Sequence, residues 1–267
     1  MAHSPPLDTA QAASAAQFDR QSDRYGKSHI LADTDDVAEA LEGISPPGSE
    51  EGGGRALDVA TGGGHTALYL ARKGWKVTAG DVSTRMLENA MKLLAEEGLQ
   101  LKTRVFPAEE IPFESASFEL VTVRVAPHHF SSPERFVSEV ARVLRPGGHF
   151  MLIDGTVLDN DPETEEWLHH VEKWRDPSHG KFLPPSAWEA IITANGLEII
   201  SRRIHDKKQP DLEWYFETAA TPTENRTLVL EAVRTIPASV RQALRLCEEE
   251  GKIVWWWPIL SLSARKR

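Results

Sequence analysis

The sequence predicts a doubly wound α/β fold with a mostly parallel sheet. Short apolar runs that are typical of strands buried on both faces occur at 56–60, 76–81, 101–106, 118–126 and 149–154. Amphipathic helical patterns lie between several of these runs, at 65–73, 84–98 and 133–145. Strands that alternate with helices of this length favour a parallel sheet with helices on both faces. Arg-Pro-Gly-Gly at 145–148 ends the third helix, because proline and glycine both stop helices.

The chain divides by composition into five segments. The Ala-, Pro- and Ser-rich residues 1–16 are expected to form a disordered tail, and residues 17–55 an N-terminal helical segment and linker. Residues 56–156 form the core, and the polar, aromatic residues 157–185 form a helical insertion. Residues 186–267 complete the sheet and add further helices.

The C-terminal segment has its own predicted elements. Helical patterns occur at 186–195, 211–219 and 224–249, and strand patterns at 197–205 and 252–264. In the last strand, Trp255 and Trp257 share one face by alternation, and Pro258 requires an edge or a bulge.

The composition limits which binding partners and which cellular compartment we expect for this protein. The 267 residues carry a formal net charge of −10, which disfavours nucleic acid as a partner because phosphate binding needs clustered Lys and Arg. One cysteine, Cys247, excludes an internal disulfide and a multi-cysteine metal site, and favours a reducing, cytoplasmic setting. No apolar run approaches the roughly 20 residues that span a bilayer, and the N-terminus lacks the pattern of a signal peptide. We therefore expect no membrane contact, and a monomer or homodimer.

Three successive glycines follow the first predicted strand, in ALDVATGGGHTALYLA at 56–71. Glycine allows a tight turn, exposes N–H groups at the start of the next helix and lets the backbone approach a ligand. Asp58 at the end of the strand suits a cation, such as the amino group or sulfonium of S-adenosylmethionine. Asp81 ends the second strand, where its carboxylate can accept both hydroxyls of a ribose. A dinucleotide site, whose pattern is G-x-G-x-x-G, and a turn that binds nothing are the alternatives.

Four stretches together resemble the class I S-adenosylmethionine-dependent methyltransferases, in the group that includes the ubiquinone/menaquinone-biosynthesis C-methyltransferases. They are LDVATGGGHTA, GDVSTRML, FPAEEIPFESASFELVTVRVAPHHF and RVLRPGGHFMLID. VEKWRDPSH at 171–179 further resembles an uncharacterised bacterial subgroup. The resemblance covers about residues 17–205 and implies a Rossmann-like methyltransferase fold in which the insertion at 157–185 is a lid that lines the acceptor pocket.

The resemblance also implies a cofactor site for S-adenosylmethionine. Val82 and Met86 would flank the adenine, and Asp81 would hold the ribose. Pro107 stands where the family usually has an Asp for the adenine amino group, so the Ala108 backbone or Glu109 would substitute. The full set of expected cofactor-binding residues is Asp58, Ala60, Thr61, Gly62, Gly64, Asp81, Val82, Met86, Ala108, Glu109 and Arg124.

Catalytic candidates follow the fourth predicted strand. His128 and His129 are candidate general bases for a hydroxyl acceptor, and capping of the loop is their structural alternative. Arg124 would face the cofactor carboxylate or an anionic acceptor, or else tie down the helix-rich cap. The sequence predicts no metal site, although His169 and Glu172 would share a helix face.

Other residues are expected around the mouth of the site. Arg175 and Asp176 would form an ion pair inside the insertion, and the N-terminal residues Phe18, Tyr25, Ser28 and His29 would pack across the cofactor mouth.

These observations predict an S-adenosylmethionine-dependent methyltransferase that moves a methyl group to a small-molecule acceptor by in-line displacement. The alternative is a protein of the same fold that binds the cofactor without methylating. Methylation of nucleic acid or protein is a weaker third possibility.

Overall fold

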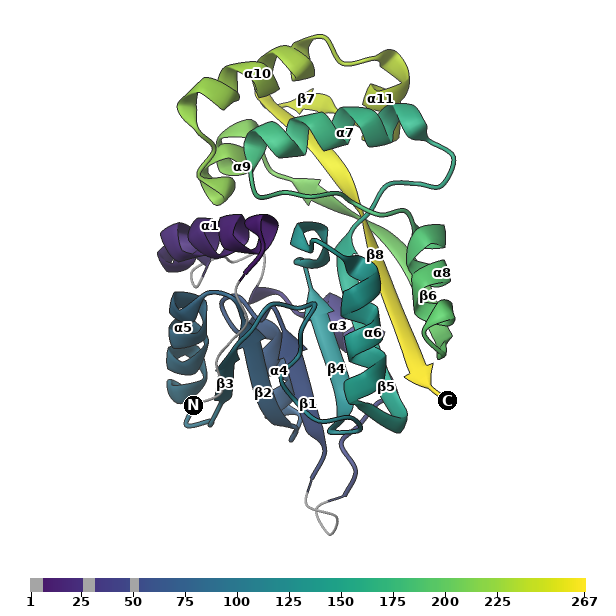
Figure 1. The fold of residues 1–267 in the computed structure, drawn as a ribbon. Coiled ribbons are helices and arrows are strands. Elements are labelled where there is room, and N and C mark those ends of the chain that lie inside the picture. The colour runs from purple at the N-terminus through teal and green to yellow at the C-terminus, as the bar shows by residue number, and fades with distance from the viewer. Residues whose placement is uncertain (1–6, 26–31, 49–52) are drawn as a thin grey trace.

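A single large sheet organises the chain in the computed structural model, which describes residues 7–25, 32–48 and 53–267 (Figure 1). The sheet order is β3-β2-β1-β4-β5-β8-β6, with β7 paired to β8. Its strands are β1 (Arg55–Val59), β2 (Lys76–Asp81), β3 (Lys102–Val105), β4 (Phe118–Arg124), β5 (Leu144–Gly155), β6 (Leu197–Gln209), β7 (Cys247–Glu249) and β8 (Lys252–Lys266).

The first five strands are parallel, and β8 runs antiparallel to both β5 and β6. The sheet is therefore mostly parallel, as predicted. Asp58 in β1 lies beside Ala79 in β2 and Thr122 in β4, so these strands end at one edge. The strand order reverses between β1 and β4, and ligands of doubly wound sheets bind beyond the strand ends at such a point.

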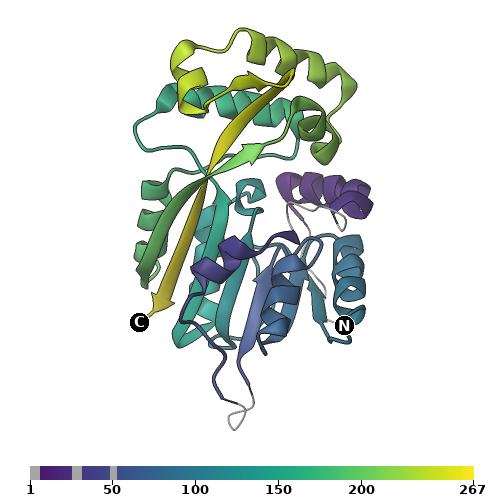
Figure 2. The same cartoon turned by 180° about the vertical axis from the view of Figure 1, so that it is seen from behind.

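Helices cover both faces of the sheet, as the doubly wound prediction requires (Figures 1 and 2). One apolar cluster joins the sheet to α6 (Pro133–Val143) and α8 (Pro185–Ala194). A second cluster, on the other face, joins it to α3 (Asp35–Ala40), α4 (His65–Arg72) and the end of α5 (Thr84–Ala95).

A third cluster forms a separate helical layer beyond the strand ends, at the top of Figure 1. This helical layer consists of α7 (Pro162–Arg175), α9 (Leu212–Ala219), α10 (Thr223–Arg234) and α11 (Ala238–Ala243), together with β7 and the start of β8. The layer includes Trp255 and Trp257 on the same face of β8, whereas Trp256 faces Lys208 and Arg245. None of the helices in the described part of the chain is long and apolar enough to cross a membrane.

Pro258 lies where β8 leaves β5. The last β5 pair is Gly155 with Ile259, and the Pro258 carbonyl accepts a hydrogen bond of 2.9 Å from Thr156 N–H. The missing proline N–H therefore removes no ladder bond with β5. Pro258 is still paired with Asp206 of β6, so the edge expected at this residue exists only on the β5 side.

Two expectations about the ends of the chain are wrong. Helix α1 (Thr9–Tyr25) occupies half of the expected disordered tail, because Asp8 and Gln11 cap its first turn. The single helical stretch expected at 224–249 is divided into α10, α11 and β7, since Pro237 interrupts the helical hydrogen bonds. Figure 1 shows α1 between the helical layer and the strand ends.

Candidate functional site

A cavity of about 870 Å³, counted to its open mouth, lies at the carboxyl ends of the parallel strands. The lining residues come from α1, the glycine turn, the loops after β2, β3 and β4, and the η2 turn (Pro127–His129). They are Gln11, Ser14, Phe18, Ala60, Thr61, Gly62, Gly63, His65, Thr66, Asp81, Val82, Met86, Phe106, Ala108, Glu109, Arg124, Val125, Ala126, His129 and Phe130.

Two glycines of the turn after β1 have different roles: Gly62 borders the cavity, and Gly64 packs against α5. Gly62 has φ +52°, and a Cβ built on it meets no atom within 4 Å, so its missing side chain leaves open space in the cavity. Gly64 has φ +88° and does not line the cavity, and a Cβ there would lie 2.7 Å from the Ala90 Cβ. Gly64 therefore allows α4 to approach α5 and, unlike Gly62, is not one of the residues that line the cavity.

Asp81 lies on the cavity wall with its carboxylate fixed by backbone groups. Oδ2 accepts from Gly62 N–H at 3.0 Å, and Oδ1 accepts from Ser83 N–H at 2.9 Å. Burial raises the pKa of the Asp81 carboxyl to about 6 despite these hydrogen bonds. Each oxygen still has a lone pair, so both can accept from a pair of vicinal hydroxyls.

Asp58 is buried behind the glycine turn and does not line the cavity. Its two oxygens accept from the hydroxyls of Thr61, at 2.6 Å, and Thr122, at 2.7 Å. Burial raises the pKa of the Asp58 carboxyl to about 6. The carboxylate thus connects the turn to β4 and does not line the cavity, where a cationic ligand was expected beside it.

One end of the cavity has an apolar wall. Val82, Met86, Phe106 and Ala108 line it, and the neighbouring Glu109 is 4% exposed. An aromatic ring system fits between such side chains, with its polar edge toward Glu109.

Arg124 also lines the cavity and fastens the start of α3 together with the residues just before it. Its Nε donates to Asp36 Oδ2 at 2.9 Å, and its Nη2 donates to the Asp33 carbonyl at 2.6 Å. The next residue, Val125, also lines the cavity and has φ +52°, a strained conformation for a β-branched residue. Such strain is concentrated at functional sites.

The two histidines after β4 have different environments. His129 lines the cavity, and its Nδ1 lies 3.1 Å from the Ser178 carbonyl, which fixes the tautomer with Nε2 unprotonated. Burial and the adjacent His128 lower the pKa of His129 to about 3. His129 is therefore a neutral hydrogen-bond acceptor toward the cavity.

His128 does not line the cavity. Its Nδ1 lies 2.7 Å from Asp154 Oδ1 at the end of β5, and its ring lies 4.2 Å from that of His129. Burial lowers the pKa of His128, but the Asp154 carboxylate outweighs this, so the net pKa is raised. The structure thus separates the histidine that reaches the cavity from the one that readily holds a proton.

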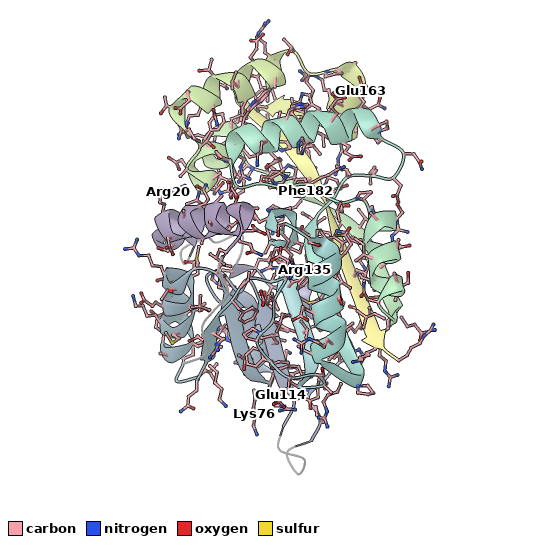
Figure 3. The ribbon with its side chains drawn as sticks, viewed as in Figure 1. Arg20, Lys76, Glu114, Arg135, Glu163 and Phe182 are labelled. Carbon is pink, nitrogen blue, oxygen red and sulfur yellow. The ribbon has the colours of Figure 1, made fainter. Side chains whose placement is uncertain are left out.

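The segment 157–185 contacts this histidine pair from the helical layer rather than lining the cavity. Phe182, labelled in Figure 3, lies 5.1 Å from the His128 ring, and the His179 ring lies at the same distance. Figure 3 also shows Phe182 between α7 and the strand ends. The expected lid over the cofactor cavity is therefore replaced by α1.

His169 and Glu172 lie three residues apart in α7, as expected, but Glu172 is fully buried whereas His169 is exposed, and one expectation about the end of this helix is corrected. Arg175 pairs with Glu172 at 3.2 Å instead of with Asp176, because Tyr215 and Thr218 of α9 hold the guanidinium on that side. In the described part of the chain, no group of His, Cys, Asp and Glu side chains is placed to hold a metal ion.

Comparisons with known proteins address the chemistry of this cavity. A family model described as a methyltransferase domain matches residues 57–152. YcgJ, an uncharacterised methyltransferase of Bacillus subtilis strain 168, is 32% identical over 181 residues, which cover 67% of this chain and 70% of YcgJ. The chain belongs to the class I S-adenosylmethionine-dependent methyltransferases.

Two further methyltransferases are similar to this chain, one in its crystal structure and one in its sequence. The crystal structure of a presumed methyltransferase from Bacillus halodurans C-125 has a TM-score of 0.79 and 30% identity, and it matches over 87% of this chain and 99% of its own. The UbiE ubiquinone/menaquinone C-methyltransferase of Desulfotalea psychrophila strain LSv54 is 37% identical over 109 residues, 40% of this chain and 44% of UbiE. The cofactor of this methyltransferase is therefore S-adenosylmethionine.

The cavity of the methyltransferase fits that cofactor. The open space above Gly62 admits a ligand against the backbone, and Asp81 has acceptors for the ribose hydroxyls. Most of the expected cofactor residues line one cavity: Ala60, Thr61, Gly62, Asp81, Val82, Met86, Ala108, Glu109 and Arg124.

Several lining residues of the methyltransferase were not predicted. Gln11 and Ser14 lie in the segment expected to be disordered, although the pattern Asp8-x-x-Gln11 is a recognisable start of a helix. Asp154 was not identified as the partner of His128, because no sequence spacing relates the end of one strand to the loop after another. Ser28 and His29, expected at the cofactor mouth, lie outside the described residues.

Proposed function

We propose that the protein methylates a small-molecule acceptor that enters the cavity beside His129. The observation that carries this proposal is the roof of the cavity. Phe18 of α1 contacts the His129 ring edge-on at 5.0 Å, so the reacting end is enclosed by one helix and one loop. A compact acceptor fits such a space better than a folded macromolecule does.

Side chains in the cavity support this chemistry. When bound, S-adenosylmethionine supplies a methyl group on a sulfonium that is already activated as a leaving group, so the protein mainly positions the acceptor and excludes water. The neutral His129 Nε2 would accept a hydrogen bond from an acceptor O–H or N–H. The adjacent His128, paired with Asp154, would help to keep His129 unprotonated.

We infer the same residue roles for the cofactor that the sequence predicted, with two exceptions. Asp81 would hold the ribose, and Val82 and Met86 the adenine. Arg124 would act through the segment that it fastens as well as through its charge. Asp58 and Gly64 would support the turn without touching the ligand.

The same observations support a limited set of partners. The formal charge of −10 argues against nucleic acid, and the exposed, free Cys247 fits a reducing, cytoplasmic compartment. We propose a monomer or homodimer, which light scattering during size-exclusion chromatography would distinguish.

An acceptor screen tests the proposal. Purified protein would be incubated with S-adenosylmethionine and a library of hydroxyl, amine, thiol and activated-carbon compounds, and release of S-adenosylhomocysteine would be measured. We expect release with at least one compound and none with Gly62→Val. Release with protein or RNA fractions and with no small molecule would contradict the small-molecule proposal.

A further inference from the structure

Two oxygen atoms of Ser178 face the ring of His129, the histidine that lines the cavity. The Ser178 carbonyl oxygen lies 3.1 Å from His129 Nδ1, and Ser178 Oγ lies 3.3 Å from the same nitrogen. An N–H on Nδ1 can donate to both oxygens, whereas an unprotonated Nδ1 would face the lone pairs of the carbonyl. Only an unprotonated Nε2 can accept a hydrogen bond from a methyl acceptor in the cavity, which is the role proposed for His129.

The Asp176 carboxylate decides in which direction the Ser178 hydroxyl donates. Asp176 Oδ1 accepts from Ser178 Oγ at 2.6 Å and from Ser178 N–H at 2.8 Å. Because a serine hydroxyl has one hydrogen, Ser178 Oγ can then only accept from His129. Asp176 is 5% exposed, and both of these hydrogen bonds go to the residue that contacts His129 Nδ1. The carboxylate therefore acts on the ring of His129 through one intervening residue.

Asp176 itself is held by the helical layer. It ends α7, and its N–H donates to the Glu172 carbonyl at 2.8 Å. The Glu172 carboxylate is fully buried and accepts from the Tyr215 hydroxyl at 2.7 Å and from Arg175 Nη1 at 3.2 Å. Arg175 also lies over the Tyr215 ring, with its guanidinium carbon 4.4 Å from the ring centre. Buried polar groups that bond to one another in this way make the end of α7 rigid.

The chain that follows α7 is fastened to the backbone of the η2 turn. Gly180 N–H donates to the His128 carbonyl at 2.8 Å, and Lys181 N–H donates to the same oxygen at 3.1 Å. A Cβ on Gly180 would lie 2.7 Å from that oxygen, so the approach requires a glycine. Residues 176–181 thus hold both the backbone of His128 and the ring of His129.

We propose that Asp176 is a positioning residue for His129, which acts through Ser178 to keep the His129 ring in the orientation and tautomer that present an unprotonated Nε2 to the methyl acceptor. Asp176 does not line the cavity. This inference rests on the role of His129 in the proposed function. It gives the end of α7 and the residues after it a part in acceptor binding that does not require them to cover the cavity.

The tautomer of His129 can be observed without any acceptor. In NMR spectra of protein with isotopically labelled histidine rings, the nitrogen chemical shifts distinguish an N–H at Nδ1 from an N–H at Nε2. The signals of His129 are those that disappear in His129→Gln. At neutral pH we expect the wild-type protein to show the tautomer of His129 with the proton on Nδ1.

Asp176→Ala should allow the other tautomer to appear, because the Ser178 hydroxyl can then donate to Nδ1 and its turn is free to move. We expect the ratio of the two tautomers to change by about tenfold, as the loss of one hydrogen bond predicts. Asp176→Asn keeps an acceptor oxygen for Ser178 and should restore the wild-type tautomer, which separates the hydrogen bonds from the charge. Ser178→Ala keeps the carbonyl and loses the hydroxyl, so it should give a smaller change in the same direction.

A matched control lies at the other end of the same helix. Asp161 caps the start of α7, where its side chain accepts from Thr164 N–H at 3.2 Å, and it does not line the cavity. Asp161→Ala should lower the melting temperature without changing the tautomer of His129. If Asp176→Ala fails to fold by circular dichroism, Ser178→Ala still provides the test.

A kinetic measurement extends the test once the screen has found an acceptor. Asp176→Ala should lower kcat by up to about 100-fold, because a displaced His129 no longer orients the acceptor. The KM for S-adenosylmethionine should stay within about twofold of the wild-type value, since Asp176 has no part in the cofactor site.

Three outcomes would overturn the inference. They are a wild-type His129 with its proton on Nε2, an unchanged tautomer in every folded variant of Asp176 and Ser178, and no rescue by Asp176→Asn. Failure of the proposed function would look different, because the tautomer would then respond to Asp176 while no small acceptor caused release of S-adenosylhomocysteine.

Discussion

Asp81 and Ser83 divide two tasks within three residues. The Ser83 hydroxyl accepts from Met86 N–H at 3.1 Å and caps α5, a role that serine often has immediately before a helix. The Asp81 carboxylate lies on the cavity wall instead. Their substitution should therefore separate binding from stability.

Asp81→Ala should weaken binding of S-adenosylhomocysteine by roughly tenfold to a few hundredfold, because two hydrogen bonds to a charged acceptor are lost. Ser83→Ala should lower the unfolding free energy by about 1 kcal/mol with little change in affinity. Calorimetry and thermal unfolding of both variants would check this. An unchanged dissociation constant for Asp81→Ala would refute its role as a ribose ligand.

Protonation of Asp81 gives a pH dependence with a defined sign. Its folded pKa of about 6 lies above the usual 3.8, so the folded state without ligand holds the proton more tightly and loses stability as pH rises through this range. Asp19 faces the same carboxylate and adds to the shift. Ribose binding needs the ionised form.

We therefore expect the affinity for S-adenosylhomocysteine to fall as pH decreases below about 6, by up to about tenfold per unit. Titration calorimetry from neutral to acidic pH would measure it. Asp81→Asn is the control that should remove most of the dependence, and an identical pH profile in that variant would assign it to another group.

The element that decides the geometry of the site is the turn between β1 and α4. Both Gly62 and Gly64 have positive φ, but only Gly64 lies against another helix. A sequence pattern treats these glycines as equivalent, whereas the structure assigns one to the ligand and the other to packing.

Gly64→Ala should lower the unfolding free energy by roughly 2–5 kcal/mol, because it combines overpacking against Ala90 with a left-handed backbone. Gly62→Ala should cost only about 1–2 kcal/mol, from the backbone term alone. Gly62→Val should in addition abolish cofactor binding. Chemical denaturation and calorimetry would test the set, and equal destabilisation by the two alanine variants would show that the packing difference has no effect.

At the scale of the whole molecule, two kinds of contact hold the elements that cover the strand ends. In α7, the buried residues include Leu168 and Val171, which belong to the apolar cluster of the helical layer. The buried side chains described in α1 are polar: Ser14, Gln17, Gln21 and Ser22. Polar contacts that water can replace make α1 the easier element to release.

Hydrogen exchange should therefore be faster in α1 than in α7 without ligand, and S-adenosylhomocysteine should slow it mainly in α1. Mass spectrometry of peptides from both helices, with and without ligand, measures this. The opposite result, with protection gained in 157–182 and none in α1, would restore the lid that the sequence predicted for the insertion.

The sequence by itself determined the alternation of strands and helices and the family, and it identified nine residues that line the cavity. These depend on local signals: hydrophobic periodicity, a glycine turn after a strand, and an acid at the end of each of two neighbouring strands. Parallel strands bring their carboxyl ends to one edge, so residues such as Ala60, Asp81 and Arg124 converge once the topology is known.

Only the tertiary structure decided which polar groups meet across segments distant in sequence. Asp58 is turned away from the cavity by Thr122 of the neighbouring strand, and His128 is paired with Asp154. The roof of the site is α1 rather than the insertion at 157–185, because Gln11 reaches Glu109 across 98 positions of the chain. Such hydrogen bonds cannot be recognised from a periodic sequence pattern. Each one depends on how whole helices and strands pack together and not on the residues that neighbour its donor or acceptor in the sequence.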